Sequence, residues 1–136
     1  MTTNYELLDM IKKLGICNFK GIIMKDEFAK LDDPWDTEYG IYNLQDSDET
    51  GSHWAAWCHK SNKWYHFCPY GADGPKEFIT YTHRVRGNTH HVREEIISST
   101  FQIQKFGTSV CGQLCILLIY LLDQDIEFEQ AVISML

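Results

Sequence analysis

The longest apolar run of the chain lies near its C-terminal end, and it constrains the fold more than any other feature. Between Val110 and Leu122 the only strongly polar side chain is that of Gln113. A helix that is apolar around most of its circumference has to be covered by other elements. The run is also shorter than the roughly 20 residues that span a bilayer. We therefore expect a buried central helix and no membrane partner.

The rest of the chain contains short segments of both types. Apolar spacing typical of helices occurs at 5–14, 25–31, 75–81 and 125–136, and strand-like runs occur at 39–44, 53–58, 64–68 and 96–103, with a short apolar segment at 21–24. The two central runs flank Lys60-Ser61-Asn62-Lys63, which is typical of a β-hairpin. The pattern predicts one α+β domain, residues 1–136, with a small antiparallel sheet packed on the central helix.

Charge and cysteine content narrow the function classes. The formal net charge is −7, which disfavours a nucleic-acid partner because phosphate binding requires excess Lys and Arg. The basic residues of 83–93 are interpreted as a solvated loop. Five cysteines and no secretory signal indicate free thiols rather than a disulfide framework. We expect an intracellular or virion location.

One cysteine stands at the start of the apolar run, in Gly107-Thr108-Ser109-Val110-Cys111-Gly112. Thr108 or Ser109 is a suitable helix cap, and Cys111 would then lie in the first turn. The partial positive charge there favours the thiolate, the form that attacks carbonyl groups. The alternative is a buried structural thiol, which is the interpretation we give to Cys115.

A cysteine nucleophile needs a base and donors for the oxyanion that develops on the carbonyl. His53 stands at the entry of a predicted strand and is followed by Trp54. Gln104 precedes Cys111 by a short turn-forming segment, so its amide and the Cys111 N–H could serve the same oxygen. The alternative for His53 is an ordinary surface histidine.

These residues resemble a known family. The order His53-Trp54, then Gln104, then Cys111-Gly112 is similar to the His-Trp, Gln and Cys-Gly order of adenovirus protease (adenain) and, more distantly, of the ubiquitin-like-protein proteases. Further similar stretches are 41–43 with 51–54, 65–71, and 111–115, so that the resemblance covers roughly residues 38–122.

The resemblance implies an adenain-type, circularly permuted papain-like fold. It implies a cysteine endopeptidase with Cys111 as nucleophile, His53 as base and Gln104 as oxyanion donor. The implied substrates are viral structural precursor proteins, cut in the virion or in the host cytoplasm or nucleus, with small residues beside the cut. It also raises an activating peptide as a partner, and it implies no cofactor.

The chain departs from the family at one site position. Relatives carry Asp or Glu where this chain has Cys68, and that carboxylate orients the histidine. A neutral thiol accepts hydrogen bonds poorly. Three interpretations remain open: a Cys–His dyad suffices, another acceptor such as Asp73 or Asn43 serves, or the domain has lost activity.

Other functions remain open as well. A deubiquitinase-like or deSUMOylase-like isopeptidase would use the same residues. A non-catalytic binding module derived from a protease is favoured by Cys68 and disfavoured by the retained Cys111, His53 and Gln104. A zinc site could draw on Cys58, His59, His66 and Cys68, but neighbouring strand residues point to opposite faces, so we expect no metal.

Overall fold

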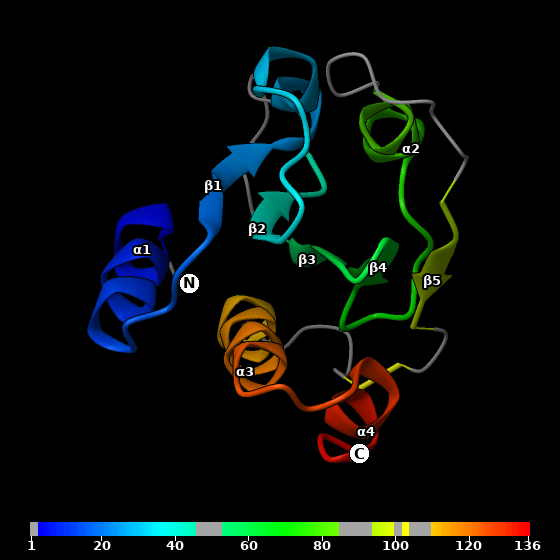
Figure 1. The fold of residues 1–136 in the computed structure, drawn as a ribbon. Coiled ribbons are helices and arrows are strands. Elements are labelled where there is room, and N and C mark those ends of the chain that lie inside the picture. The colour runs from blue at the N-terminus through cyan, green and yellow to red at the C-terminus, as the bar shows by residue number, and fades with distance from the viewer. Residues whose placement is uncertain (1–2, 46–52, 85–93, 100–101, 104–109) are drawn as a thin grey trace.

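Five strands form a single sheet, in a computed structural model that describes residues 3–45, 53–84, 94–99, 102–103 and 110–136. The spatial order follows the sequence: β1 (Phe19–Met24), β2 (Glu38–Asn43), β3 (Trp54–Lys60), β4 (Lys63–Phe67) and β5 (Ile96–Ser98). Figure 1 shows the sheet with helices above and below it.

The two central strand pairs, β2–β3 and β3–β4, are antiparallel, whereas the outer pairs, β1–β2 and β4–β5, are parallel. The expected α+β class is confirmed, but the expected antiparallel sheet is wrong at both outer pairs. The reason is the connection: a helical crossover separates β1 from β2 and another lies between β4 and β5, and crossovers of this kind join parallel strands.

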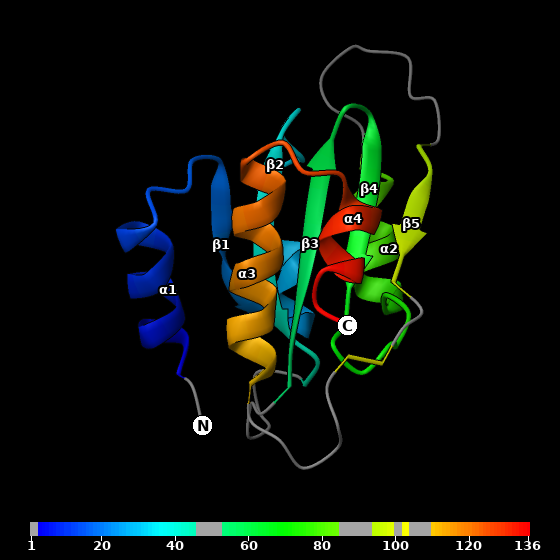
Figure 2. The same ribbon diagram turned by 90° about the horizontal axis from the view of Figure 1, so that it is seen from below.

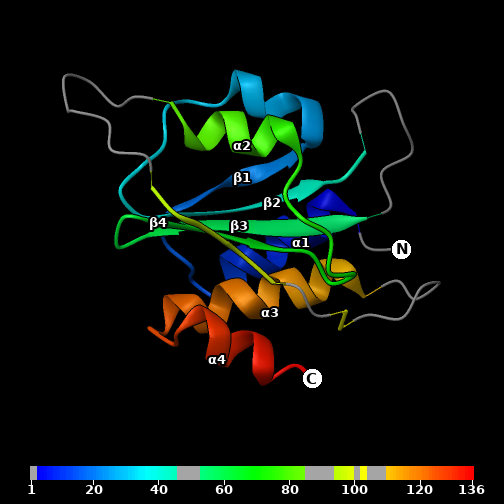
Figure 3. The ribbon, with the colours of Figure 1, turned by 90° about the vertical axis from the view of Figure 1, so that its right-hand side faces the viewer.

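Five helices cover the two faces. The 3-10 helix η1 (Lys25–Lys30) and α2 (Lys76–Thr82) lie on one face, and α1 (Asn4–Lys13), α3 (Cys111–Asp123) and α4 (Phe128–Ile133) lie on the other. Figure 3 shows this three-layer arrangement edge-on, and Figure 2 shows α3 lying along the sheet between α1 and α4. Within the described residues, no helix is long and apolar enough to cross a membrane.

Local chemistry explains the main boundaries. Thr3 caps α1 by accepting the N–H of Glu6 at 3.2 Å, and Gly15 follows the helix with a φ of 66°. Ser61 and Asn62 both adopt positive φ between β3 and β4, which is the geometry of a tight hairpin turn. The helix expected from residue 125 begins only at Phe128, and the strand expected over 96–103 ends at Ser98.

Each face of the sheet carries its own apolar core. The α3-side core packs the inner face of α3 against alternate residues of β3, namely Trp54, Ala56 and Cys58. The α2-side core takes the intervening positions of β3 and adjoining aromatic residues: Phe28, Tyr42, Ala55, Trp57, Trp64, Cys68, Phe78 and Tyr81. This alternation fixes which residues of β3 can approach the start of α3.

Candidate active site

Cys111 is the first residue of α3 and belongs to the α3-side core. The N-cap position is Val110, which makes no side-chain capping bond. Thr108 and Ser109, the residues expected to cap the helix, lie outside the described part of the chain. The N–H groups of a first helical turn have no intrahelical acceptor, so the sulfur stands at the positive end of the helix dipole.

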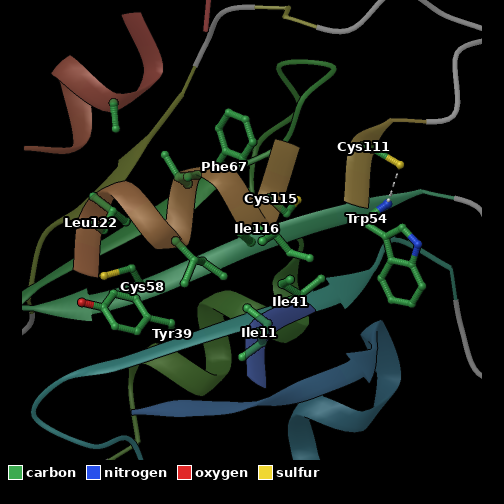
Figure 4. Packing of buried hydrophobic residues seen from close by; sticks show 14 of the residues in the cluster. Ile11, Tyr39, Ile41, Trp54, Cys58, Phe67, Cys111, Cys115, Ile116 and Leu122 are labelled. Carbon is green, nitrogen blue, oxygen red and sulfur yellow. Dashed lines mark hydrogen bonds between the residues drawn. The ribbon is translucent and has the colours of Figure 1, made fainter. Parts of the chain in front are cut away.

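The Cys111 sulfur also receives a hydrogen bond from the sheet. The backbone N–H of Trp54 donates to Cys111 Sγ with an N···S distance of 3.4 Å (Figure 4). This contact joins the first residue of β3 to the first residue of α3. A backbone donor aimed at sulfur stabilises a thiolate more than a neutral thiol, because a charged acceptor makes the stronger bond.

The register explains why this N–H is available. Leu44 N–H donates to His53 O at 2.8 Å, so the next pair, Asn43 with Trp54, is of the type whose N–H groups point away from each other. The N–H of Trp54 is thus directed toward the β4 side. Continuing the β3–β4 register beyond Ala56 and Phe67 places Pro69 opposite Trp54. The chain turns away there, since Gly71 N–H closes a turn onto Cys68 O at 2.8 Å.

His53 directly precedes Trp54 and is half-buried. Its Nδ1 is buried and has no hydrogen-bond partner in the part of the chain that the structure describes. The imidazole instead packs on the ring of Tyr70, with centroids 5.3 Å apart and planes at 72°. Neither of the alternative acceptors reaches Nδ1: Asp73 is exposed, and the Oδ1 of Asn43 accepts the N–H of Gln45 at 3.0 Å.

Cys68 lies one residue beyond the end of β4 and is completely buried in the α2-side core. Continued register places it opposite Ala55, on the strand face that His53 shares by alternation. Cys111 belongs to the core on the opposite side of the sheet. The position at which the adenain resemblance leads one to expect a carboxylate is therefore an apolar one here.

Gln104 lies outside the described residues, as do all residues from 104 to 109. The described residue before it, Ile103, donates its N–H to Pro69 O at 2.8 Å. The chain therefore passes beside Pro69 immediately before Gln104. The role expected for Gln104 stays a prediction.

Two other buried thiols, Cys58 and Cys115, have raised pKa values. Burial raises the pKa of Cys58 to about 12, despite the opposing effect of Lys60. Burial also raises the pKa of Cys115, and negative charge on Cys111 or Cys68 would raise it further. Both thiols are core groups, and the prediction that Cys115 lies in the core is confirmed.

The residues considered as zinc ligands have separate roles. Cys58 packs in the α3-side core. His59 directs Nδ1 to the carbonyl of Trp35 at 2.6 Å and Nε2 to Glu94. His66 Nε2 bonds the Tyr42 hydroxyl at 2.6 Å. In the part of the chain with assigned positions, no three His, Cys, Asp or Glu side chains gather as a metal site.

Two site contacts were not predicted from the sequence. The donor on Cys111 Sγ is the backbone N–H of Trp54, and the ring on His53 belongs to Tyr70. The sequence did contain a signal for Tyr70, because Pro69-Tyr70-Gly71 follows the strand that ends beside His53. From the sequence alone, residues 65–71 indicated only the family resemblance.

The fold is similar to that of a solved viral enzyme, the ASFV pS273R protease. One crystal structure of that protease superposes with a TM-score of 0.70 and 16% sequence identity, covering 96% of this chain and 60% of the other. A second, selenomethionine structure gives a TM-score of 0.55 and 18% identity over 75% of this chain and 40% of the other. The chain has the fold of a viral protease.

The likeness to the ASFV protease is one of fold. The present chain spans only 60% of the longer chain in the better superposition. No protein-family model matches the sequence, and no curated protein matches it either. The expected protease fold is thus supported, whereas the adenain assignment and the expected site roles stay predictions.

Proposed function

We propose that this chain is a cysteine protease in which Cys111 is the nucleophile and His53 is the base. The observation that carries the proposal is the placement of Cys111 Sγ at the start of α3, 3.4 Å from the N–H of the residue after His53. The fold shared with the ASFV protease agrees with this chemistry. A protein or peptide would be the substrate.

The reaction follows from the chemistry of the side chains. His53 takes up the proton of the Cys111 thiol, and the resulting thiolate attacks the carbonyl carbon of the scissile bond. The resulting oxyanion is held by the Cys111 N–H and, as the resemblance implies, by the amide of Gln104. Protonated His53 then donates its proton to the leaving amine. Water, deprotonated by His53, hydrolyses the thioester and restores the thiol.

Access to the nucleophile requires movement, because Cys111 is only 3% exposed. A substrate carbonyl can reach the sulfur only when neighbouring groups shift.

We propose structural precursor proteins of a virus as the substrates, and the virion or the infected cell as the location. These proposals rest on the adenain resemblance alone.

The test of the mechanism uses thiol labelling and cleavage together. Purified protein is treated with limiting iodoacetamide, the adducts are mapped by mass spectrometry, and cleavage of a degenerate peptide library is followed. We expect Cys111 to react faster per thiol than Cys17, which is exposed. Cys111→Ala should abolish cleavage, and the control Cys17→Ala should leave it unchanged. Cleavage that survives Cys111→Ala would refute the assignment.

A second candidate is a non-catalytic binding module derived from a protease. It is favoured by the unpartnered Nδ1 of His53 and by the apolar surroundings of Cys68. In that case Cys111 would react no faster than an ordinary thiol. The isopeptidase alternative is tested with a different probe, ubiquitin or SUMO carrying a C-terminal thiol-reactive group. This probe would label Cys111 if the chain were an isopeptidase.

A further inference from the structure

The base of the proposed site lacks a hydrogen bond from any described residue at one of its two ring nitrogens. In a Cys–His–carboxylate arrangement, a hydrogen bond to the second ring nitrogen fixes the imidazole. Here His53 Nδ1 is buried, and no described residue forms a hydrogen bond with it. The residue at the carboxylate position, Cys68, is enclosed by the α2-side core. Another contact has to hold the ring if the site is to be preorganised.

Tyr70 makes that contact. Its ring centroid lies 5.3 Å from the centroid of the His53 ring, and the planes are at 72°. Perpendicular packing of this kind is a favoured aromatic geometry. An imidazole packed against a second ring loses freedom to rotate. A hydrogen bond at Nδ1 would restrict the ring in the same way.

The Tyr70 backbone is firmly placed. Tyr70 sits in the turn that Gly71 N–H closes onto Cys68 O at 2.8 Å, and Gly71 follows with a φ of 81°. Pro69 fixes its own φ, and its carbonyl accepts the N–H of Ile103 at 2.8 Å. The turn is thus tied both to the end of β4 and to the segment that leads toward the nucleophile.

Tyr70 also interacts electrostatically with the reacting sulfur. Burial of the hydroxyl raises the pKa of Tyr70, and the negative charges that Cys111 and Cys68 would carry raise it further. The Tyr70 side chain therefore interacts electrostatically with Cys111 and packs on the ring of His53. It is the one residue for which the described contacts show both relations.

We propose that Tyr70 is a positioning residue, whose ring holds the His53 imidazole in place next to the start of β3 and substitutes for a hydrogen-bonding third residue. This inference rests on the proposed protease function. It assigns the orientation of the base to aromatic packing rather than to a carboxylate. The ring is the effective part of the side chain.

The experiment compares Tyr70→Phe, which keeps the ring, with Tyr70→Leu, which removes it. The matched control is Tyr5→Leu, at a tyrosine that is 80% exposed. The substrate-free readout is the rate of Cys111 alkylation by iodoacetamide across the pH range. A thiol paired with imidazolium reacts well below the ordinary thiol pKa of about 8.5, whereas an unpaired one does not.

Tyr70→Phe should keep the wild-type profile, and Tyr70→Leu should lower the alkylation rate at pH 6 by about 3- to 10-fold, the range expected from an aromatic pair. Where a cleaved peptide is found, kcat should fall by a similar factor with KM little changed. Thermal unfolding of both variants shows whether they are folded at the assay temperature, and any variant that is not is assayed at a lower one.

The outcomes separate this inference from the proposed function. If wild-type Cys111 shows no enhanced reactivity at pH 6, the protease proposal fails. If wild-type reactivity is enhanced and Tyr70→Leu keeps it, the protease proposal stands and the positioning role is refuted. Equal losses in Tyr70→Phe and Tyr70→Leu would assign the effect to the hydroxyl, which also refutes the role given to the ring.

Discussion

The backbone N–H of Trp54 donates to Cys111 Sγ across 3.4 Å, so the start of β3 and the start of α3 are joined at the sulfur. The contact needs no side-chain chemistry from Trp54. It depends on the point at which β4 ends and on the close approach of α3 to β3. The reactivity of Cys111 should therefore respond to changes in packing between these elements.

Gly112→Ala tests that dependence. A Cβ at position 112 would lie 2.8 Å from Leu7 Cδ2 and 3.3 Å from Trp54 Cδ1. The Leu7 terminus can move aside, and alanine favours the helix by about 1 kcal/mol, so crowding of about 1–3 kcal/mol is partly offset. We expect a small change in unfolding free energy and slower alkylation of Cys111, as Trp54 is displaced. Unchanged alkylation kinetics would show that the N–H···S contact is tolerant of this displacement.

The same contacts show where prediction from the sequence succeeded and where it ended. The apolar run at 110–122 predicted α3 to within a residue at each end. A helix that is buried on most sides consists mainly of apolar residues, so it is recognisable from residue types alone. The hairpin at 60–63 was recognisable for a similar reason: Ser61 and Asn62 suit a tight turn. The parallel outer strands were missed because pairing direction depends on the path of the chain.

The site was predictable only in part. The residue types and order around His53 and Cys111 indicated thiol chemistry. In the structure Trp54, the residue after His53, donates its N–H to Cys111 Sγ. A backbone N–H leaves no signature in a sequence, however, and the packing of Tyr70 on His53 depends on the register of β3 with β4. Gln104 stays a prediction for the separate reason that it lies outside the described residues.

Substitution of Cys68 tests whether a Cys–His pair suffices. Because Cys68, like the other described residues, makes no hydrogen bond to His53 Nδ1, Cys68→Ala should keep substantial cleavage activity. Cys68→Asp should equal or raise activity per folded molecule, since a carboxylate would stabilise the imidazolium by about 1–3 kcal/mol. The measurement is kcat/KM together with the unfolding temperature.

The structure predicts that Cys68→Asp lowers the stability of the fold. Cys68 is buried in the same core as Tyr42, Trp64 and Phe78, and a carboxylate buried there should lower the unfolding temperature. Cys58→Ala, at a buried thiol of the opposite core, is the control for the loss of a core thiol. Loss of cleavage in Cys68→Ala, with Cys58→Ala still active, would show that the thiol itself is required.

A buried ion pair on the α2 side gives a prediction for stability. Glu38 is completely buried and accepts hydrogen bonds from Trp57 Nε1 and Trp35 N, each at 2.7 Å, and from the Tyr81 hydroxyl. Lys20 Nζ lies 3.3 Å from Glu38 Oε1, and its side chain is 3% exposed. Burial lowers the pKa of Lys20, while Glu38 opposes that shift.

Glu38→Gln should reduce the unfolding free energy by about 3–5 kcal/mol, because it leaves the buried Lys20 cation without its anion. Urea unfolding measures the change. The double variant Lys20→Met/Glu38→Gln should lose less than the sum of the two single variants. Additive losses would show that the two charges do not interact. The alkylation rate of folded Cys111 should be unchanged, since the pair lies in the other layer.

The lowered pKa of His66 predicts how the stability of the protein depends on pH. Burial lowers the pKa of His66 to about 4, from an ordinary value of 6.5. In the folded protein the ring therefore stays neutral below pH 6.5, whereas in the unfolded chain it binds a proton. Stability is unaffected by this group above pH 6.5, decreases as the pH falls toward 4, and levels off below that. The full difference corresponds to about 3 kcal/mol.

The measurement is urea unfolding between pH 7.5 and pH 4.5 for the wild type and for His66→Gln, whose amide can still bond the Tyr42 hydroxyl that His66 contacts at 2.6 Å. Glutamine does not titrate, so the decline in unfolding free energy should be smaller in this variant, even if its stability at pH 7.5 is lower. His83→Gln, at an exposed histidine, should follow the wild-type curve. Parallel curves for wild type and His66→Gln would mean that other groups cause the acid sensitivity and that His66 can be protonated without loss of the fold.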